Sequence, residues 1–214
     1  MNPQSAIRHP QSDGPQSEEL EIRKARLTDV GAMLELINGY AHAGLMLPRA
    51  EFELCENIRD FSVAYRGGQL AGCGALHFYT PQMAEVRSLA VAPEIKSGGV
   101  GRRVVEALVE EGRQYGLDIV FAFTYVVPFF EKCGFRVVDR GSLPLKAWKD
   151  CVRCPHFNCC DEIPVVYVLS PNAADWQDTS DGLIHLSSHI TRWPGADDEP
   201  IRVPTPAHTG FQVR

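Results

Sequence analysis

One stretch of the sequence restricts the fold and the ligand more than any other. The residues from Ala84 to Pro93 have the pattern of a β-strand, a loop with Gly98, Gly99 and Gly101 follows, and a helix pattern comes directly after. Glycines let the backbone approach phosphate oxygens, successive N–H groups converge on them, and the positive end of the helix dipole faces the anion. The segment therefore predicts a pyrophosphate site, with a plain helix-entry turn as the alternative.

The order of residues in this loop separates it from two other classes of phosphate loop. It lacks the Gly-Lys-Ser/Thr ending with which a nucleoside-triphosphate loop holds magnesium. Gly99-Val100-Gly101 also lacks the third glycine of a dinucleotide fingerprint. These differences point away from nucleoside triphosphates and nicotinamide or flavin dinucleotides.

The rest of the central chain alternates between strand and helix patterns. Such alternation predicts an α/β (α+β) fold with a mixed, twisted sheet of about six or seven strands flanked by about four helices. The expected strands cover residues 21–25, 61–65, 69–78, 85–91, 119–123, 136–139 and 165–169. One expected helix follows Thr28, a second follows the loop over 44–49 and includes Leu54 to Ile58, and the other two cover 101–115 and 128–133. Gly67-Gly68 marks the turn of a β-hairpin.

Both ends of the chain differ from the centre in composition. Residues 1–19 are rich in Gln, Ser, Pro and Asp and have few large apolar side chains, so they cannot offset the entropy lost on ordering. Residues 171–214 show neither a period of two nor one of 3.6. We expect a disordered leader over 1–19, one domain over 20–170 and a flexible tail over 171–214.

The charge of the chain excludes some classes of partner. A net charge of -6 argues against binding to duplex nucleic acid, which requires a surplus of Lys and Arg on one face. No apolar run approaches the ~20 residues of a membrane helix, and the first residues lack the basic-then-apolar order of a signal peptide. We expect a cytoplasmic protein that binds neither nucleic acid nor a membrane.

The glycine loop and a later motif resemble the GCN5-related N-acetyltransferases (GNAT). Their coenzyme A loop, Gln/Arg-x-x-Gly-x-Gly/Ala, is similar to Lys-Ser-Gly-Gly-Val-Gly over residues 96–101, and residues 129–135 match the family in order and spacing. The resemblance implies a GNAT fold and acetyl-CoA as co-substrate. It also implies that the strand lends backbone groups to the pantetheine arm and the loop holds the pyrophosphate, through Leu89, Ala90, Val91, Lys96, Ser97, Gly98, Gly99, Val100, Gly101 and Arg102.

A narrower resemblance covers about Glu21 to Leu169 and points to the short, stand-alone N-acetylglutamate synthases. Four segments carry it: residues 44–49, 85–91, 124–125 and 148–155. It implies transfer of acetyl from acetyl-CoA to the α-amino group of L-glutamate by direct attack in a ternary complex, as in arginine biosynthesis. The alternatives are a GNAT enzyme for another small amine or a protein N-terminus, and a non-catalytic module that binds acyl-CoA or metal.

Amide formation needs a base for the ammonium proton and an acid for the departing thiolate. Glu85 occupies the place where many family members keep a carboxylate and is the candidate base, against the alternative of a solvated strand-end carboxylate. Tyr125, at the end of a buried strand, is the candidate acid. The alternative is that Tyr125 is an aromatic residue of the core. Phe130 stands where many relatives place that tyrosine.

Glutamate would bring two carboxylates, which guanidinium groups hold well. Arg49 and Arg87 are the candidate anchors, and strand alternation puts Arg87 on the same face as Glu85. The resemblance adds Ser88 as a substrate-binding residue. A surface charge is the alternative for both arginines.

The seven cysteines include four between Cys151 and Cys160. Cys151, Cys154 and Cys160 have spacing that could form a structural zinc site within a Cys-rich loop over 148–162. Reduced thiols packed in a loop are the alternative, and the transfer itself requires no metal. Dimers are common for this fold, and we expect a homodimer.

Overall fold

The computed structural model describes residues 19–143, 151, 159–171 and 173. The predicted leader lies outside this range except for residue 19, and the predicted tail except for residues 171 and 173. The Cys-rich loop is described only in part. Within the described ranges, no helix is long and apolar enough to cross a membrane.

Seven strands form one mixed sheet, as the sequence predicts. Their order is β1-β2-β3-β4-β5-β7-β6, and every pair is antiparallel except β4 with β5. The strands are β1 (Glu21–Lys24), β2 (Phe61–Arg66), β3 (Gln69–Thr80), β4 (Met83–Val91), β5 (Ile119–Thr124), β6 (Arg136–Val137) and β7 (Ile163–Val168).

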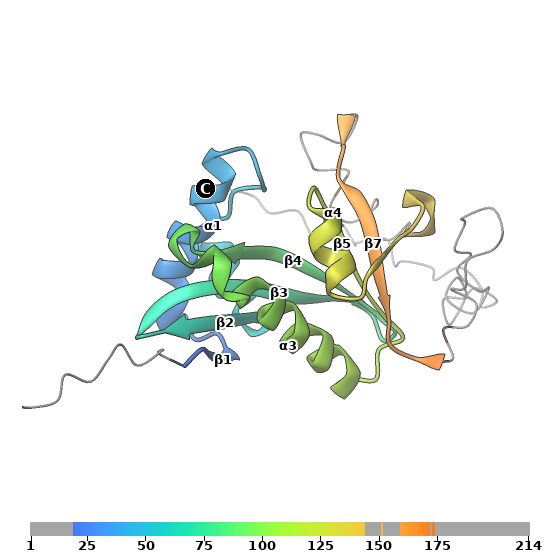
Figure 1. Cartoon of the computed structure of the whole chain (residues 1–214), viewed down its shortest axis with the longest axis horizontal. Coiled ribbons are helices and arrows are strands. Elements are labelled where there is room, and N and C mark those ends of the chain that lie inside the picture. The colour runs from blue at the N-terminus through green and yellow to red at the C-terminus, as the bar shows by residue number, and fades with distance from the viewer. Residues whose placement is uncertain (1–18, 144–150, 152–158, 172, 174–214) are drawn as a thin grey trace, which may run out of the picture.

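Helices cover both faces of the sheet (Figure 1). The four α-helices are α1 (Val30–His42), α2 (Glu51–Glu56), α3 (Val100–Gln114) and α4 (Val127–Lys132), with 3-10 turns at η1 (Leu27–Asp29), η2 (Ile58–Asp60), η3 (Pro93–Gly98) and η4 (Arg140–Ser142). On one face α3 and α4 bury a core that includes Val104, Leu108 and Phe130. On the other, α1 and α2 bury Met33, Ile37 and Leu54.

Strand β4 separates from β5 after its first residues. The two strands pair only over Met83–Glu85 and Ile119–Phe121, although β4 continues to Val91. A wedge therefore opens between them, and the rest of β4 has no ladder partner in β5.

A bulge at Ser88 changes which side chains of β4 face each core. Ser88 has a φ of 52°, and the register with β3 passes from Ala75↔Arg87 to Cys73↔Ala90. One extra residue on β4 reverses the alternation of side chains. Val86 and Leu89 consequently both face the α3 side, whereas Ala90 faces the α1 side.

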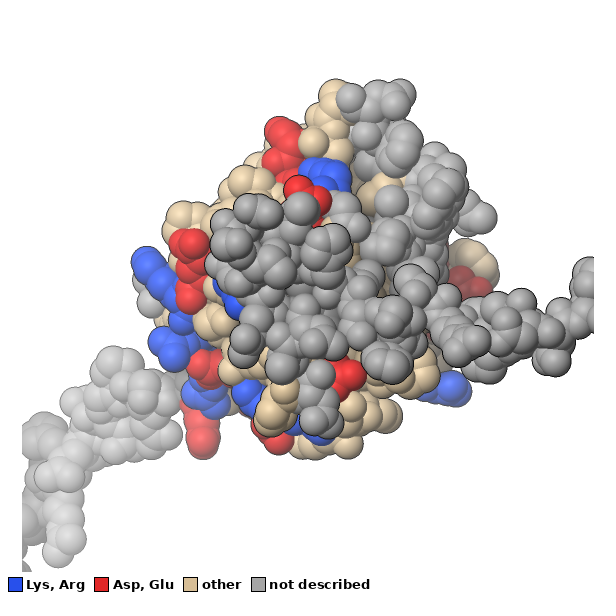
Figure 2. Space-filling view, turned by 90° about the vertical axis from the view of Figure 1, so that its right-hand side faces the viewer, with Lys and Arg blue, Asp and Glu red and all other residues tan. Residues whose placement is uncertain are grey.

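Charged side chains on the described surface are mixed in sign. Figure 2 shows Lys and Arg side chains beside Asp and Glu on the face that it draws. Lys24 pairs with Glu111 at 2.8 Å, Arg102 with Glu106 at 2.7 Å and Arg113 with Glu110 at 3.2 Å. This distribution on the drawn face differs from the single-sign stripe typical of nucleic-acid binders.

Candidate active site

The glycine loop enters α3 through a left-handed glycine, close to β4 and α4. Gly99 has a φ of 69° and caps α3, a left-handed conformation that suits glycine. Val100 and Gly101 are buried at the first turn of the helix. A Cβ atom on Gly101 would lie 3.2 Å from Cγ2 of Val91 and 3.4 Å from Cζ of Phe129, so this glycine lets the helix start close to β4 and α4.

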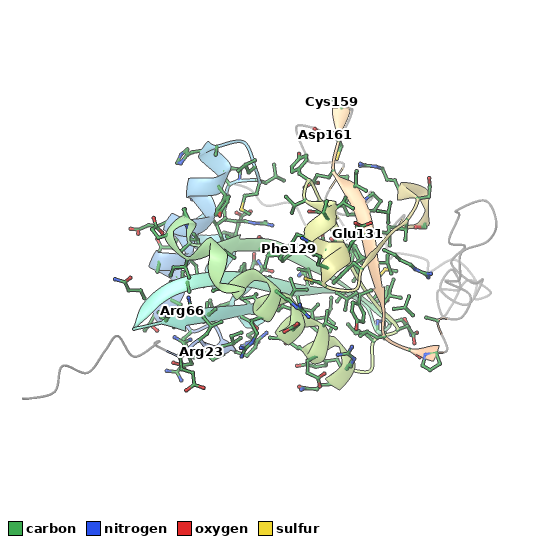
Figure 3. The ribbon with its side chains drawn as sticks, in the orientation of Figure 1. Arg23, Arg66, Phe129, Glu131, Cys159 and Asp161 are labelled. Atoms are coloured by element: carbon green, nitrogen blue, oxygen red, sulfur yellow. The ribbon has the colours of Figure 1, made fainter. Side chains whose placement is uncertain are left out.

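Two arginines near this loop have different surroundings. Arg102, a predicted cofactor residue, is 63% exposed at its side chain and its Nε donates to Glu106 Oε1 at 2.7 Å. Arg66, labelled in Figure 3, lies at the end of β2. It lies against Gly98, where a Cβ atom would be only 2.7 Å from Nη1 of Arg66. Arg66 was not predicted as a residue of this site, because only the β2–β3 pairing brings it to the loop. Of Lys96 and Ser97 only the backbone is described.

The predicted pantetheine residues Leu89, Ala90 and Val91 lie on the part of β4 beyond its pairing with β5. Tyr40 of α1 donates its hydroxyl proton to the carbonyl oxygen of Val91 at 2.7 Å, which ties α1 to the end of this strand. The wedge thus presents backbone groups from β4 next to the glycine loop.

Glu85 is a buried carboxylate. It is 2% exposed, and Tyr79 donates a hydrogen bond to its Oε2 at 2.9 Å. The alternative of a solvated strand-end carboxylate is therefore wrong. A buried carboxylate at the mouth of the wedge has the surroundings of a functional group, because burying it costs free energy that packing alone would not require.

Arg87 lies on the same face as Glu85, as the alternation predicts, and is 14% exposed at its side chain. Its Nη2 is 4.0 Å from Asp60 Oδ2, and the same oxygen lies 2.6 Å from Nδ1 of His77. The alternative of a plain surface charge is wrong for this residue. Asp60 and His77 were missed, since their proximity depends on how β2, β3 and β4 align.

The other predicted acceptor residues lie around the same face. Asn38 of α1 holds the backbone of Arg49 through two hydrogen bonds of 2.9 Å, to its N–H and to its carbonyl oxygen. Arg49 is half-buried ahead of α2. Ser88 forms the bulge that follows Arg87. The backbone of Arg49 is thereby fixed to α1 beside the core on this side of the sheet.

Tyr125 is 46% exposed just after β5, so the alternative of a core aromatic is wrong. Partial burial, the charge of Glu162 and a hydrogen bond with Asp161 raise the pKa of Tyr125 to about 12. Figure 3 shows Asp161 beside the start of β7. Phe130 is 4% exposed and packs edge-on against Phe129 and Phe135. Its ring is a core element and leaves the acid role to another residue.

The predicted zinc site lies partly outside the described residues, because Cys154 is not among them. In the described part of the chain, no three His, Cys, Asp or Glu residues are grouped as metal ligands would be. Burial raises the pKa of Cys133 and raises that of Cys73 to about 12, which keeps both thiols protonated at neutral pH.

Comparison with known proteins agrees with this geometry. The model of the acetyltransferase (GNAT) family matches residues 32–135. An uncharacterized N-acetyltransferase of Chlorobaculum tepidum is 41% identical over 148 residues, which cover 69% of this chain and 96% of that protein. An amino-acid acetyltransferase of Mycobacterium tuberculosis is 29% identical over 154 residues, covering 71% of this chain and 87% of that protein.

A solved structure extends the comparison to three dimensions. N-acetylglutamate synthase from Neisseria gonorrhoeae, complexed with coenzyme A and N-acetyl-glutamate, superimposes with a TM-score of 0.65 at 27% identity. The match covers 72% of this chain and 36% of the synthase, so the chain corresponds to about a third of that longer protein.

The fold, the wedge and these similarities define the class of protein. The chain belongs to the acetyltransferase (GNAT) family and is an N-acetyltransferase whose co-substrate is acetyl-CoA.

Proposed function

We propose that this enzyme transfers the acetyl group of acetyl-CoA to the α-amino group of L-glutamate, giving N-acetyl-L-glutamate and CoA. The observation that carries the proposal is the pairing of a buried carboxylate, Glu85, with a part-buried guanidinium, Arg87, on one face of β4. A base and an anion anchor two residues apart suit an acceptor whose amine reaches Glu85 while its side-chain carboxylate reaches Arg87. The amino-acid acetyltransferase relatives support the same class of acceptor.

The reaction follows from this arrangement. The acceptor ammonium loses a proton to Glu85, and its nitrogen attacks the thioester carbonyl to form the C–N bond. Backbone N–H groups on the open part of β4 stabilise the oxyanion. The C–S bond then breaks, and Tyr125 donates a hydrogen bond to the departing thiolate.

The raised pKa of Tyr125 limits what this phenol does. A thiol has a pKa of about 8.5. A phenol with a pKa of about 12 therefore stays protonated beside the thiolate and stabilises its charge without transferring its proton completely. The thiolate then takes its proton from water.

Thiol release from acetyl-CoA tests the anchor. With L-glutamate as acceptor, Arg87→Ala should raise KM for glutamate by about 100-fold, equivalent to loss of a charge-assisted hydrogen bond, and leave KM for acetyl-CoA unchanged. Arg87→Lys should recover part of the affinity, because it keeps the charge but loses the planar fork. Equal KM values for glutamate in all three proteins would refute Arg87 as the anchor.

The charge of Asp60 influences which acceptor the site would prefer. Its carboxylate oxygen 4.0 Å from Arg87 offsets part of the positive charge there. This favours, as a second candidate, an amino acid with an uncharged side chain, such as L-glutamine, which has nearly the shape of glutamate. Comparing kcat/KM for these two acceptors separates the candidates.

We further propose that the enzyme acts in the cytoplasm, in arginine biosynthesis, as one domain over residues 20–170 and as a homodimer. Light scattering on the purified protein tests the dimer.

A further inference from the structure

A row of polar side chains crosses the sheet from the buried base toward solvent. His77 on β3 lies directly opposite Glu85 on β4, and Nδ1 of His77 is 2.6 Å from Oδ2 of Asp60 at the end of η2. Glu85 is 2% exposed, while the side chains of His77 and Asp60 are 16% and 22% exposed. Solvent access thus increases along the row.

The row lies between two apolar clusters on the same face. One contains Ala75, Met33 and Leu54, and the other contains Met83 and Phe121. Phe121 is the neighbour of Glu85 on β5. Apolar side chains therefore lie on both sides of Glu85. The polar row provides a path between these clusters for the proton that Glu85 accepts.

The contact with Asp60 determines which tautomer of His77 is available. An ionised carboxylate only accepts hydrogen bonds, so Nδ1 carries the proton and donates it to Asp60. Nε2 then keeps its lone pair and can accept a proton. This is how a carboxylate prepares a histidine as a base in hydrolase triads.

Among the described residues, Asp60, Glu85, Arg87 and Tyr79 lie around His77. Oδ2 of Asp60 lies 2.6 Å from Nδ1 of His77, and Glu85 stands opposite His77 on β4. Nη2 of Arg87 lies 4.0 Å from the same Asp60 oxygen. The ring of Tyr79 packs edge-on at 5.4 Å and donates its hydroxyl proton to Glu85.

We propose that His77, held by Asp60, takes from Glu85 the proton that Glu85 removed from the acceptor and passes it to solvent. The Glu85 carboxylic acid gives its proton to Nε2 of His77, which leaves a carboxylate and an imidazolium. The Nδ1 proton of the imidazolium stays on the ring and remains hydrogen-bonded to Asp60. Nε2 then loses its proton to water, which restores the neutral ring. The inference rests on the proposed role of Glu85 as base and does not depend on which amino acid is the acceptor.

Initial rates for His77→Ala test this relay, measured with acetyl-CoA and whichever amine the wild type acetylates fastest. We expect kcat to fall about 50-fold, below the range for loss of a direct general base, with both KM values within about twofold of wild type. Added imidazole should restore at least about a tenth of the lost rate, because it can occupy the vacated space. His42→Ala, an exposed histidine at the end of α1, is the matched control and should keep the wild-type rate.

The outcomes distinguish the relay from the base. If His77→Ala keeps wild-type kcat while Glu85→Gln is inactive, the relay is wrong and the base stands. If Glu85→Gln is fully active, the base assignment fails and the relay fails with it. A loss of kcat in His77→Ala that imidazole does not restore, together with a lower thermal midpoint, would show that His77 has only a structural role and would overturn the inference.

Discussion

Burial of Glu85 lowers the stability of the fold, whereas its proposed role as base requires the carboxylate at this position. A carboxylate that is 2% exposed costs free energy to bury, and the hydrogen bond from Tyr79 recovers only part of it. We predict that Glu85→Gln, which keeps the shape and can accept from Tyr79, lowers kcat by about 10²–10³-fold with little change in KM. Stopped-assay rates with saturating substrates measure this effect, and a loss under threefold would contradict it.

Tyr125 is the second residue whose role depends on its surroundings. As a hydrogen-bond donor to the thiolate, it should contribute about tenfold to kcat, which Tyr125→Phe would remove. Because its pKa is raised to about 12, the phenol stays protonated up to strongly alkaline pH. The wild-type rate should therefore show no decline caused by Tyr125 below about pH 10, and Tyr125→Phe should have a parallel pH–rate profile. A descending limb that disappears in the variant would contradict this account.

At the scale of elements, the start of α3 depends on the absence of a side chain at Gly101. A valine there would contact Val91 and Phe129 and push the helix away from β4 and α4. We predict that Gly101→Val raises KM for acetyl-CoA by about tenfold or more while KM for the acceptor changes less. Gly31→Ala in α1 is the control, since a Cβ atom there meets nothing within 4 Å. Similar acetyl-CoA KM values for Gly101→Val and wild type would refute the close-packing role.

A second contact between elements joins β1, η1 and β2. The Asp29 carboxylate, 3% exposed, accepts two hydrogen bonds from Arg23 at 2.8 and 2.9 Å, one from Tyr65 at 2.9 Å and one from the N–H of Arg26 at 2.7 Å. Asp29→Asn should lower the free energy of unfolding by about 3 kcal/mol, as loss of one partner of a buried ion pair does. Urea denaturation at pH 7 measures it, and a change below about 1 kcal/mol would contradict it.

The same carboxylate makes stability depend on acid. Hydrogen bonds from Arg23 hold the pKa of Asp29 well below its usual range. Its contribution is therefore complete above the unfolded-state pKa of about 3.9 and is lost as pH falls through the lower folded-state pKa. Between pH 5 and pH 3, the wild type should lose more unfolding free energy than Asp29→Asn. Equal losses would contradict the linkage.

Strand β4 also shows what the sequence can and cannot predict. The glycine loop, α3 and the burial of alternate residues follow from local patterns, and their predicted bounds differ from the observed ones by a few residues at most. The bulge at Ser88 does not, because nothing about a serine indicates a φ of 52°. The register that places His77 and Asp60 beside Glu85 and Arg87 depends likewise on pairing between strands that are distant in sequence.

For the whole molecule, our proposal places the acetyl donor and the acceptor on the same strand from different elements. We propose that acetyl-CoA binds at the glycine loop and the wedge between β4 and β5, whereas the polar row from Asp60 to Glu85 lies on the face covered by α1 and α2. Direct transfer needs both molecules bound together, and this division of the surface permits it. Initial-rate lines for varied acetyl-CoA at several acceptor concentrations should therefore intersect. Parallel lines would indicate an acetyl-enzyme intermediate and contradict direct attack.

A competition assay among amino acids would show whether L-glutamate is the acceptor. The purified enzyme is given acetyl-CoA and an equimolar mixture of amino acids that includes L-glutamate, L-glutamine and L-aspartate, and mass spectrometry identifies the acetylated products. We expect N-acetyl-L-glutamate to dominate and to form in equal amount with free CoA, and Arg87→Ala to abolish this preference. Dominance of another acetylated amino acid, or CoA release without an acetylated product, would contradict this expectation.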